Sequence, residues 1–241
     1  MFLALLTLRS IFEIIYFMYN KEVYSMAFSA ETLDFLFENM LNDSKLWFSE
    51  HKEDYKKKVT EPFGQLILQL KDTMLEIDSD LICDPKKISR IYRDARYAHG
   101  KSIFRDHLWY TFARSRDAYD TAGFYFSISP GGFDYGCGFY WASTETMTKL
   151  RELILKDDKL FKNALKAYKN QDVFTLYGDM YKRNKYPDES AEKQDWLNRK
   201  CIGVSCESKD FDLLFSDRLA EKVAADFKSI APVYKFFMGG Y

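Results

Sequence analysis

The sequence predicts an α+β protein that forms a single compact domain. Three observations predict this fold class. Apolar residues follow helical spacing over roughly the first third of the chain, two alternating runs flank a Pro-Gly-Gly turn in the middle, and helical spacing returns after Ser143. A helical N-terminal part, a central antiparallel hairpin or sheet and a helical C-terminal part are therefore expected. Aromatic residues make up 17% of the 241 residues, which supplies large side chains for an aromatic core.

The N-terminal part is predicted to hold three helices. Ser29 can cap the first, which ends near Asn42, because a serine hydroxyl accepts a hydrogen bond from a free N–H of the first turn. A second helix is predicted over 44–58. The third begins near Pro62, where the missing N–H of proline costs nothing. Its apolar stripe consists of Leu66, Leu70, Met74 and Ile77.

Residues in the middle of the chain have the composition and alternation that predict strands. Ile and Tyr favour a strand over 88–93, and a hairpin is predicted from two alternating runs, 124–129 and 133–141, around Pro130-Gly131-Gly132. One face of the hairpin is predicted to enter the core: Phe124, Phe126, Ile128, Phe133, Tyr135, Cys137, Phe139 and Trp141. The other face carries Gly136 and Gly138. Either a neighbouring aromatic ring covers these glycines, which is the favoured interpretation, or they form the floor of a ligand site.

The C-terminal part is predicted to be mainly helical. Two helices follow Ser143, a short extended pair surrounds Gly178-Asp179, a short helix covers 191–200 and a strand covers 201–206. The last helix begins near Ser216 and carries the apolar residues Leu219, Val223, Phe227 and Ile230.

Residues 1–26 are predicted to lie outside the domain, which then spans 27–241. They are apolar, but Arg9 and Glu13 interrupt them, so no uncharged run reaches the roughly 18 residues of a spanning helix. An amphipathic segment on a membrane or on the domain, a weak anchor and a start-site extension are the open interpretations. The last is favoured, with Met26 as initiator, because a polar break over 20–25 precedes the first capped helix.

The four cysteines and three histidines match no metal or disulfide pattern. The chain has no C-x-x-C pair and no H-E-x-x-H string. We therefore expect buried thiols in a reducing cytoplasm, no metal site and no cofactor.

The formal net charge of −1 conceals a strongly basic segment. Residues 85–105 contain seven cations and one anion, a net charge of +6, so the remainder carries −7. Arginine dominates its centre, and a guanidinium binds phosphate or carboxylate in bidentate fashion. Arg90 and Arg93 would point to opposite faces of a strand, so they converge only if the chain turns near Ala98-His99-Gly100. The candidate binding residues are Arg90, Arg93, Asp94, Arg96, Lys101 and Arg105.

Two interpretations of the basic segment stay open. In the first, it binds a small phosphorylated or carboxylate ligand, and three aromatic residues stack on it: Tyr92, Tyr97 and Phe104. In the second, its arginines form an internal ion-pair network with carboxylates nearby in sequence: Asp94, Asp106, Asp117 and Asp134. The chain would then be a structural or protein-interaction module, and its candidate surface anchors are Trp109, Tyr110 and Trp141.

Other partners are not expected. The −7 outside the basic segment would repel a nucleic-acid polymer, and only residues 1–26 suit a membrane. Asp94 could act as a base and His99 or His107 could move protons, but no complete catalytic constellation is present. Whether the protein is an enzyme, and which protein partner it has, stay open.

The arginine string resembles the signature of the domain of unknown function 2461 family of conserved hypothetical proteins. Arg90-Ile91-Tyr92-Arg93-Asp94-Ala95-Arg96-Tyr97 is similar to the family's Arg-Ile-x-Arg-Asp-x-Arg-Phe string. The resemblance spans about Ala27 to the C-terminus and agrees with Met26 as the start. The family often continues with Ser-Lys-Asp-Lys-x-Pro-Tyr, where this chain has 98–104, Ala-His-Gly-Lys-Ser-Ile-Phe. No activity is established for the family, so the resemblance implies a fold and not a reaction.

Overall fold

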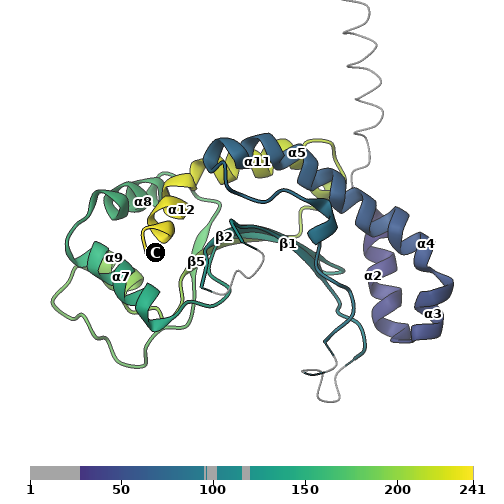
Figure 1. Cartoon of the computed structure of the whole chain (residues 1–241), viewed down its shortest axis with the longest axis horizontal. Helices are drawn as coiled ribbons and strands as arrows, with labels where there is room; N and C mark the ends of the chain where they lie inside the picture. Colours follow the sequence, from purple (N-terminus) through teal and green to yellow (C-terminus); the bar gives the residue numbers. More distant parts are fainter. Residues whose placement is uncertain (1–27, 95, 97–101, 116–119, 241) are drawn as a thin grey trace, which may run out of the picture.

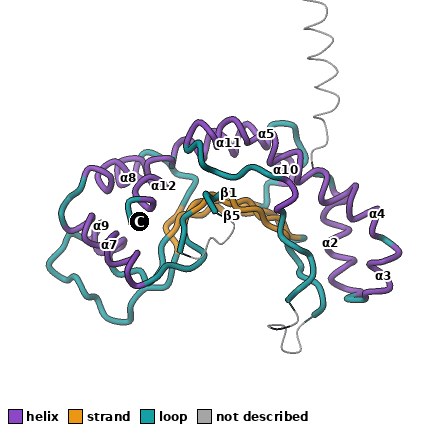
Figure 2. The backbone as a smooth tube through the Cα atoms, viewed as in Figure 1, coloured by secondary structure: helices purple, strands orange, loops and turns teal. Residues whose placement is uncertain are grey.

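An arched five-stranded antiparallel sheet forms the centre of the molecule. The computed structural model describes residues 28–94, 96, 102–115 and 120–240. The strand order is β1-β2-β3-β5-β4, and each neighbouring pair is antiparallel. Helices lie above the arch and on both sides of it (Figures 1 and 2). The predicted α+β fold is therefore confirmed. The strands are β1 (Leu108–Phe112), β2 (Gly123–Ser129), β3 (Gly132–Gly138), β4 (Thr175–Tyr177) and β5 (Gly203–Ser208).

The helical N-terminal part is confirmed, with one difference. Its helices are α2 (Ala30–Asn42), α3 (Lys45–Glu50), α4 (Lys52–Tyr55) and α5 (Glu61–Ile77). The hydroxyl of Thr32 accepts a hydrogen bond from the Ser29 N–H at 3.2 Å, which satisfies a free donor at the start of α2. The second and third predicted helices are not separated, because the π-helical turn η1 (Lys56–Thr60) joins α4 to α5.

The predicted hairpin is present as β2 and β3. Its aromatic face is buried as expected, from Phe124 to Phe139. Trp141 is an exception, with 52% of its surface exposed. Because β3 ends at Gly138, the alternation of faces no longer applies to residues that follow Phe139.

Two strand predictions are wrong. Residues 88–93 follow the short 3-10 helix η2 (Pro85–Lys87) and make only an isolated bridge, between Tyr92 and Phe104. The segment around Gly178-Asp179 is not a hairpin, because β4 pairs with β5 instead. Gly178 has a φ of 121°, so the chain turns away there in a conformation that L residues rarely adopt.

The C-terminal part is helical, as predicted. Its helices are α7 (Thr144–Leu155), α8 (Lys159–Lys169), α9 (Ala191–Leu197), α10 (Phe211–Leu214), α11 (Leu219–Ser229) and α12 (Ala231–Met238). Pro232 stands in the first turn of α12, where a proline begins a helix but cannot continue one. The predicted last helix is therefore followed by another. Among the described residues, no helix is long and apolar enough to cross a membrane.

One hydrophobic core joins the sheet to the helices on its convex side. Phe28 packs on Phe63 of α5 and on Phe126 of β2, with ring centroids 5.7 and 6.0 Å apart. Figure 1 shows α5 and α11 above this side of the sheet. Cys137 is fully buried here, and burial raises the pKa of its thiol well above the usual range, which keeps it protonated. The other three cysteines are only partly buried, contrary to expectation.

Asp78 joins three distant parts of the core edge. Its nearly buried carboxylate accepts hydrogen bonds from Arg114 Nε at 2.7 Å and from the Tyr234 hydroxyl. Burial alone would raise the pKa of Asp78, but the hydrogen bonds from Arg114 and Tyr234 outweigh it, so the pKa is lowered. The carboxylate therefore stabilises the fold above the pKa of about 3.9 that aspartate has in an unfolded chain, and this stability is lost as pH falls through the folded pKa.

We expect Asp78→Asn to lower the free energy of unfolding by about 1–3 kcal/mol at pH 7, since it removes a hydrogen-bonded charge. The difference from the wild type should shrink below about pH 4, where the wild-type carboxylate becomes protonated. Urea unfolding at pH 7, 5, 4 and 3 measures both effects. Asp217→Asn, at an exposed aspartate, is the matched control. A difference that stays constant with pH would contradict this account of Asp78.

Candidate functional site

The predicted arginines hold together an irregular ribbon formed by residues 90–94 and 102–106. Arg93 Nε donates to Ser102 Oγ at 3.1 Å and to the Phe104 carbonyl at 3.0 Å. Arg105 Nη1 donates to the carbonyls of Arg90 and Tyr92 at 2.5 and 2.8 Å. Two backbone hydrogen bonds also join the segments, from the Arg93 N–H to the Ile103 carbonyl at 2.9 Å and from the Arg105 N–H to the Ile91 carbonyl at 2.7 Å. These contacts leave one isolated bridge, between Tyr92 and Phe104, in place of the strand predicted over 88–93.

The ribbon is attached to the N-terminal helices α2 and α3. The Phe104 N–H donates to Asp43 Oδ1 at 3.1 Å, and the Phe104 ring lies 5.0 Å from that of Phe48. Phe104 is buried and is a core residue, not a stacking surface for a ligand. Tyr92 packs on Phe104 at 4.6 Å but is 40% exposed. Of the other predicted residues here, Lys101, Tyr97 and His99 lie outside the described residues.

The predicted ion-pair network is only partly present. Arg96 binds Asp94 on the surface, with Nη2 2.6 Å from Oδ2, and this hydrogen bond lowers the pKa of Asp94 to about 2. Arg93 Nη2 lies 3.8 Å from Asp106 Oδ1. Within the described ranges, no carboxylate oxygen lies within 4.0 Å of a side-chain nitrogen of Arg90 or Arg105. The predicted partner Asp117 is not among the described residues.

Arg105 packs against an aromatic ring of the sheet. Its guanidinium carbon lies 5.0 Å from the ring centre of Trp109. Burial lowers the pKa of Arg105, and the neighbouring charge of Arg93 lowers it further, while the charge of Asp94 acts in the opposite direction without cancelling the fall. His107 stacks on the same tryptophan at 5.4 Å, and its Nδ1 lies 2.8 Å from Asp106 Oδ1. The charge of Arg93 thus acts unfavourably on Arg105, which lies over the Trp109 ring.

Trp109 also belongs to the sheet, on the face opposite the core. We call this the open face. The strand register places four of its residues in one row across β1, β2, β3 and β5: Trp109, Ser127, Asp134 and Glu207. The next row consists of Thr111, Tyr125, Gly136 and Ser205. The candidate site is therefore the arginine ribbon together with the open face of the sheet.

Asp134 is a half-buried carboxylate in the middle of the open face. Burial raises its pKa, and the charge of Glu207 raises it further. Hydrogen bonds from Ser127 and Tyr125 and the charge of His107 act in the opposite direction but do not cancel the rise. The charge of His107 therefore reaches Asp134, which stands in the same row of the open face as Trp109.

The paired glycines of β3 are accounted for by close packing, as the favoured interpretation predicted. A Cβ on Gly138 would lie 2.5 Å from the Gly203 Cα and 2.8 Å from the Tyr177 hydroxyl. A Cβ on Gly203 would lie 2.3 Å from the Tyr177 ring. At Gly136 it would lie 2.1 Å from the Val204 carbonyl oxygen. An aromatic ring and the backbone of β5 thus cover the glycines, which are not the floor of a ligand site.

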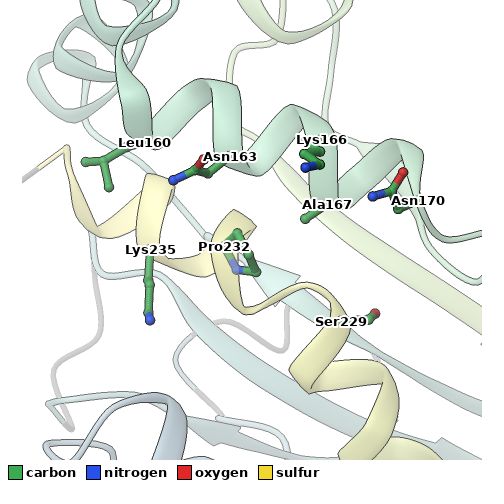
Figure 3. A pocket seen from close by; sticks show the side chains of 8 residues that line it. All are labelled: Leu160, Asn163, Lys166, Ala167, Asn170, Ser229, Pro232 and Lys235. Atoms are coloured by element: carbon green, nitrogen blue, oxygen red, sulfur yellow. The ribbon is translucent and has the colours of Figure 1, made fainter.

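Two hollows lie away from the candidate site. The larger, about 540 Å³, is a groove between α8 and α12 (Figure 3), lined by Leu160, Asn163, Lys166, Ala167, Asn170, Ser229, Pro232 and Lys235. The second, about 430 Å³, surrounds Asp78, Arg114 and Tyr234. Neither contains a predicted binding residue. In the described part of the chain, no group of three or more His, Cys, Asp or Glu side chains could hold a metal ion.

Sequence reasoning missed strand β1 and with it the role of Trp109. The signal is present, because Leu108, Tyr110 and Phe112 alternate with Trp109 and Thr111. Tyr110, predicted as a surface anchor, is buried in the core, and its hydroxyl donates to the Ile82 carbonyl at 2.8 Å.

Comparison with known proteins identifies a family. The family model described as "Conserved hypothetical protein (DUF2461)" matches residues 31–236. No curated protein matches the sequence. The matched range contains the arginine ribbon and every strand of the sheet, so the whole candidate site is part of the family's domain. The chain belongs to the DUF2461 family of conserved hypothetical proteins.

Proposed function

We propose that the protein binds a small anionic ligand, through a phosphate or carboxylate group, where Arg105 lies over Trp109. One observation carries this proposal. The charge of Arg93 acts unfavourably on Arg105 and outweighs the opposing charge of Asp94, and no described carboxylate oxygen lies within 4.0 Å of a nitrogen of Arg105. Like charges held together destabilise a fold, and an anion bound beside them removes that repulsion.

Arg105 is positioned before any ligand arrives. Its hydrogen bonds to described residues all come from Nη1, and a guanidinium has five N–H groups. No hydrogen bond joins its other N–H groups to the described residues, and they can form a bidentate contact with a phosphate or carboxylate. The charges of Arg90, Arg93, Asp94, Arg96, Arg105 and Asp106 together amount to +2, which favours an anion over a cation at this end of the site.

We expect a thermal-shift screen against phosphorylated metabolites and dicarboxylates to find a stabilising ligand. A ligand at about one hundred times its Kd adds about 2.7 kcal/mol to the free energy of unfolding. For a domain of this size that corresponds to a rise in Tm of about 5–10 °C. Both Arg90→Gln and Arg105→Gln should weaken this ligand about tenfold or more, because each removes a charge from the ribbon.

Arg183→Gln is the matched control, since it removes an exposed arginine that lies far along the chain from the ribbon. The Tm of each variant without ligand shows whether its fold is intact. Arg90 is the sharper of the two test positions, because its exposed side chain makes no ion pair to a described carboxylate. An Arg90→Gln and an Arg105→Gln variant that both bind the ligand like the wild type would overturn the proposal.

A protein-interaction role is the second candidate. Tyr140 and Trp141 follow β3 and are 93% and 52% exposed, and adjacent exposed aromatic residues are typical anchors of a protein interface. Binding of a protein partner that Tyr140→Ala abolishes and Arg105→Gln leaves unchanged would support this role. For either function we propose a reducing, cytoplasmic location, which the four free cysteines support.

A further inference from the structure

We propose that the ligand is dipolar, with an anionic group on Arg105 and a protonated amine on Asp134, so that it lies across the open face from β1 to β3. This inference rests on the proposed function, because it uses the arginine ribbon as the anchor of the anionic end. It adds a second binding position and restricts the substrate class to amino-substituted phosphates or carboxylates.

The strand register fixes the relation between the two positions. Trp109, which carries Arg105 on its ring, and Asp134 stand in the same cross-strand row, with only Ser127 between them. Neighbouring strands lie about 4.8 Å apart, so the backbones of β1 and β3 are about 10 Å apart at this row. A small molecule of ordinary size can span that distance. Both positions face the same side of the sheet, since residues in register share a face.

Asp134 is held as an acceptor by its neighbours on the open face. The hydroxyl groups of Tyr125 and of Ser127, which is directly opposite on β2, favour its ionised form. Ser127 is buried, at 8% exposed, so this support is firmly packed. Ionised carboxylate oxygens accept up to about four hydrogen bonds, which leaves acceptor positions for a ligand. Asp134 therefore presents an ionised carboxylate between a tyrosine and a serine hydroxyl.

The protein supplies no direct positive partner to Asp134 within the described residues. No described side-chain nitrogen of Lys, Arg or His lies within 4.0 Å of its oxygens. His107 is near enough to influence Asp134, but its ring nitrogen is hydrogen-bonded to Asp106 instead.

Glu207, directly opposite Asp134, favours the binding of a cation at this position. Glu207 faces Asp134 across β3 and β5, and like charges directly opposite each other destabilise a sheet. A protonated amine bound between the two carboxylates would remove this repulsion. The anionic end of the ligand would then relieve the repulsion between Arg105 and Arg93. Its amine would relieve the repulsion between Asp134 and Glu207.

Isothermal titration with matched probe pairs tests this inference. The first pair is butyl phosphate and 4-aminobutyl phosphate, and the second is hexyl phosphate and 6-aminohexyl phosphate. Each pair has the same anion and chain length and differs in the amine. We expect the amino member of at least one pair to bind about tenfold more tightly, as expected for a hydrogen bond to a charged partner.

Two variants separate the ends of the site. Asp134→Asn should remove the preference for the amine and leave the affinity for the plain alkyl phosphate within about twofold, whereas Arg105→Gln should weaken both members of a pair. If Asp134→Asn does not fold, as judged by its Tm, the exposed Glu207→Gln should still reduce the preference.

The outcomes distinguish this inference from the proposed function. Equal affinities within both pairs in the wild type would overturn the dipolar ligand and leave the anion site standing. A preference for the amine that survives both Asp134→Asn and Glu207→Gln would also overturn it. Absence of binding by all four probes and by the wider anion panel would overturn the anion site, and the dipolar ligand with it.

Discussion

Phe227→Ala is expected to lower the free energy of unfolding by about 3–5 kcal/mol, as large-to-small changes of buried aromatic residues do. The ring is fully buried on α11 and contacts three strands at once. Its centroid lies 4.9 Å from Phe124, 5.9 Å from Tyr135 and 6.4 Å from Phe112. The cavity would therefore open between the helix layer and the sheet, where neither side can close it by moving alone.

The expected fall in Tm for Phe227→Ala is about 6–20 °C for a domain of this size, and calorimetry or circular dichroism measures it. Phe211→Ala provides the control, because Phe211 is 36% exposed and stacks only on the nearby Phe215 in the described structure. We expect that change to cost about 1 kcal/mol or less. Similar losses in the two variants would show that α11 is not held to the sheet by this ring.

Gly138→Ala is expected to cost about 3 kcal/mol, because overpacking against rigid backbone forces the chain to move. The new Cβ would lie 2.5 Å from the Gly203 Cα, and a backbone atom of a paired strand cannot rotate away. The Tyr177 hydroxyl, 2.8 Å away, would also have to shift. We expect Tm to fall by about 6–12 °C.

Gly131→Ala, in the turn of the same hairpin, is the matched control for Gly138. Its Cβ would meet only Ser129 Oγ at 3.8 Å, an ordinary contact, and its φ is not positive. We expect a change within about 0.5 kcal/mol. If Gly138→Ala proved equally mild, the close approach of β3 and β5 at this point would be refuted.

Local patterns in the sequence were sufficient for the elements that form from neighbouring residues. The hairpin is one such case, because its alternation and its Pro-Gly-Gly turn are both local signals. Helices with an apolar stripe were predicted for the same reason. The strand expected over 88–93 is not present: the segment makes one isolated bridge to Phe104, and long-range hydrogen bonds from Arg93 and Arg105 complete the ribbon. Such long-range hydrogen bonds leave no periodic signal in a sequence.

By itself, the sequence determined the fold class, the hairpin, the family resemblance and the concentration of positive charge between Pro85 and Arg105. Composition and short periodicity depend only on neighbouring residues, so they can be read without a fold. Only the tertiary structure decided which groups face one another. The register of β1, β2, β3 and β5 places Trp109 in one row with Asp134 and Glu207, although almost one hundred residues separate its ends. That register depends on packing of the whole sheet against its helices. The sequence alone therefore does not show that Asp134 and Glu207 share a row with the tryptophan beneath Arg105.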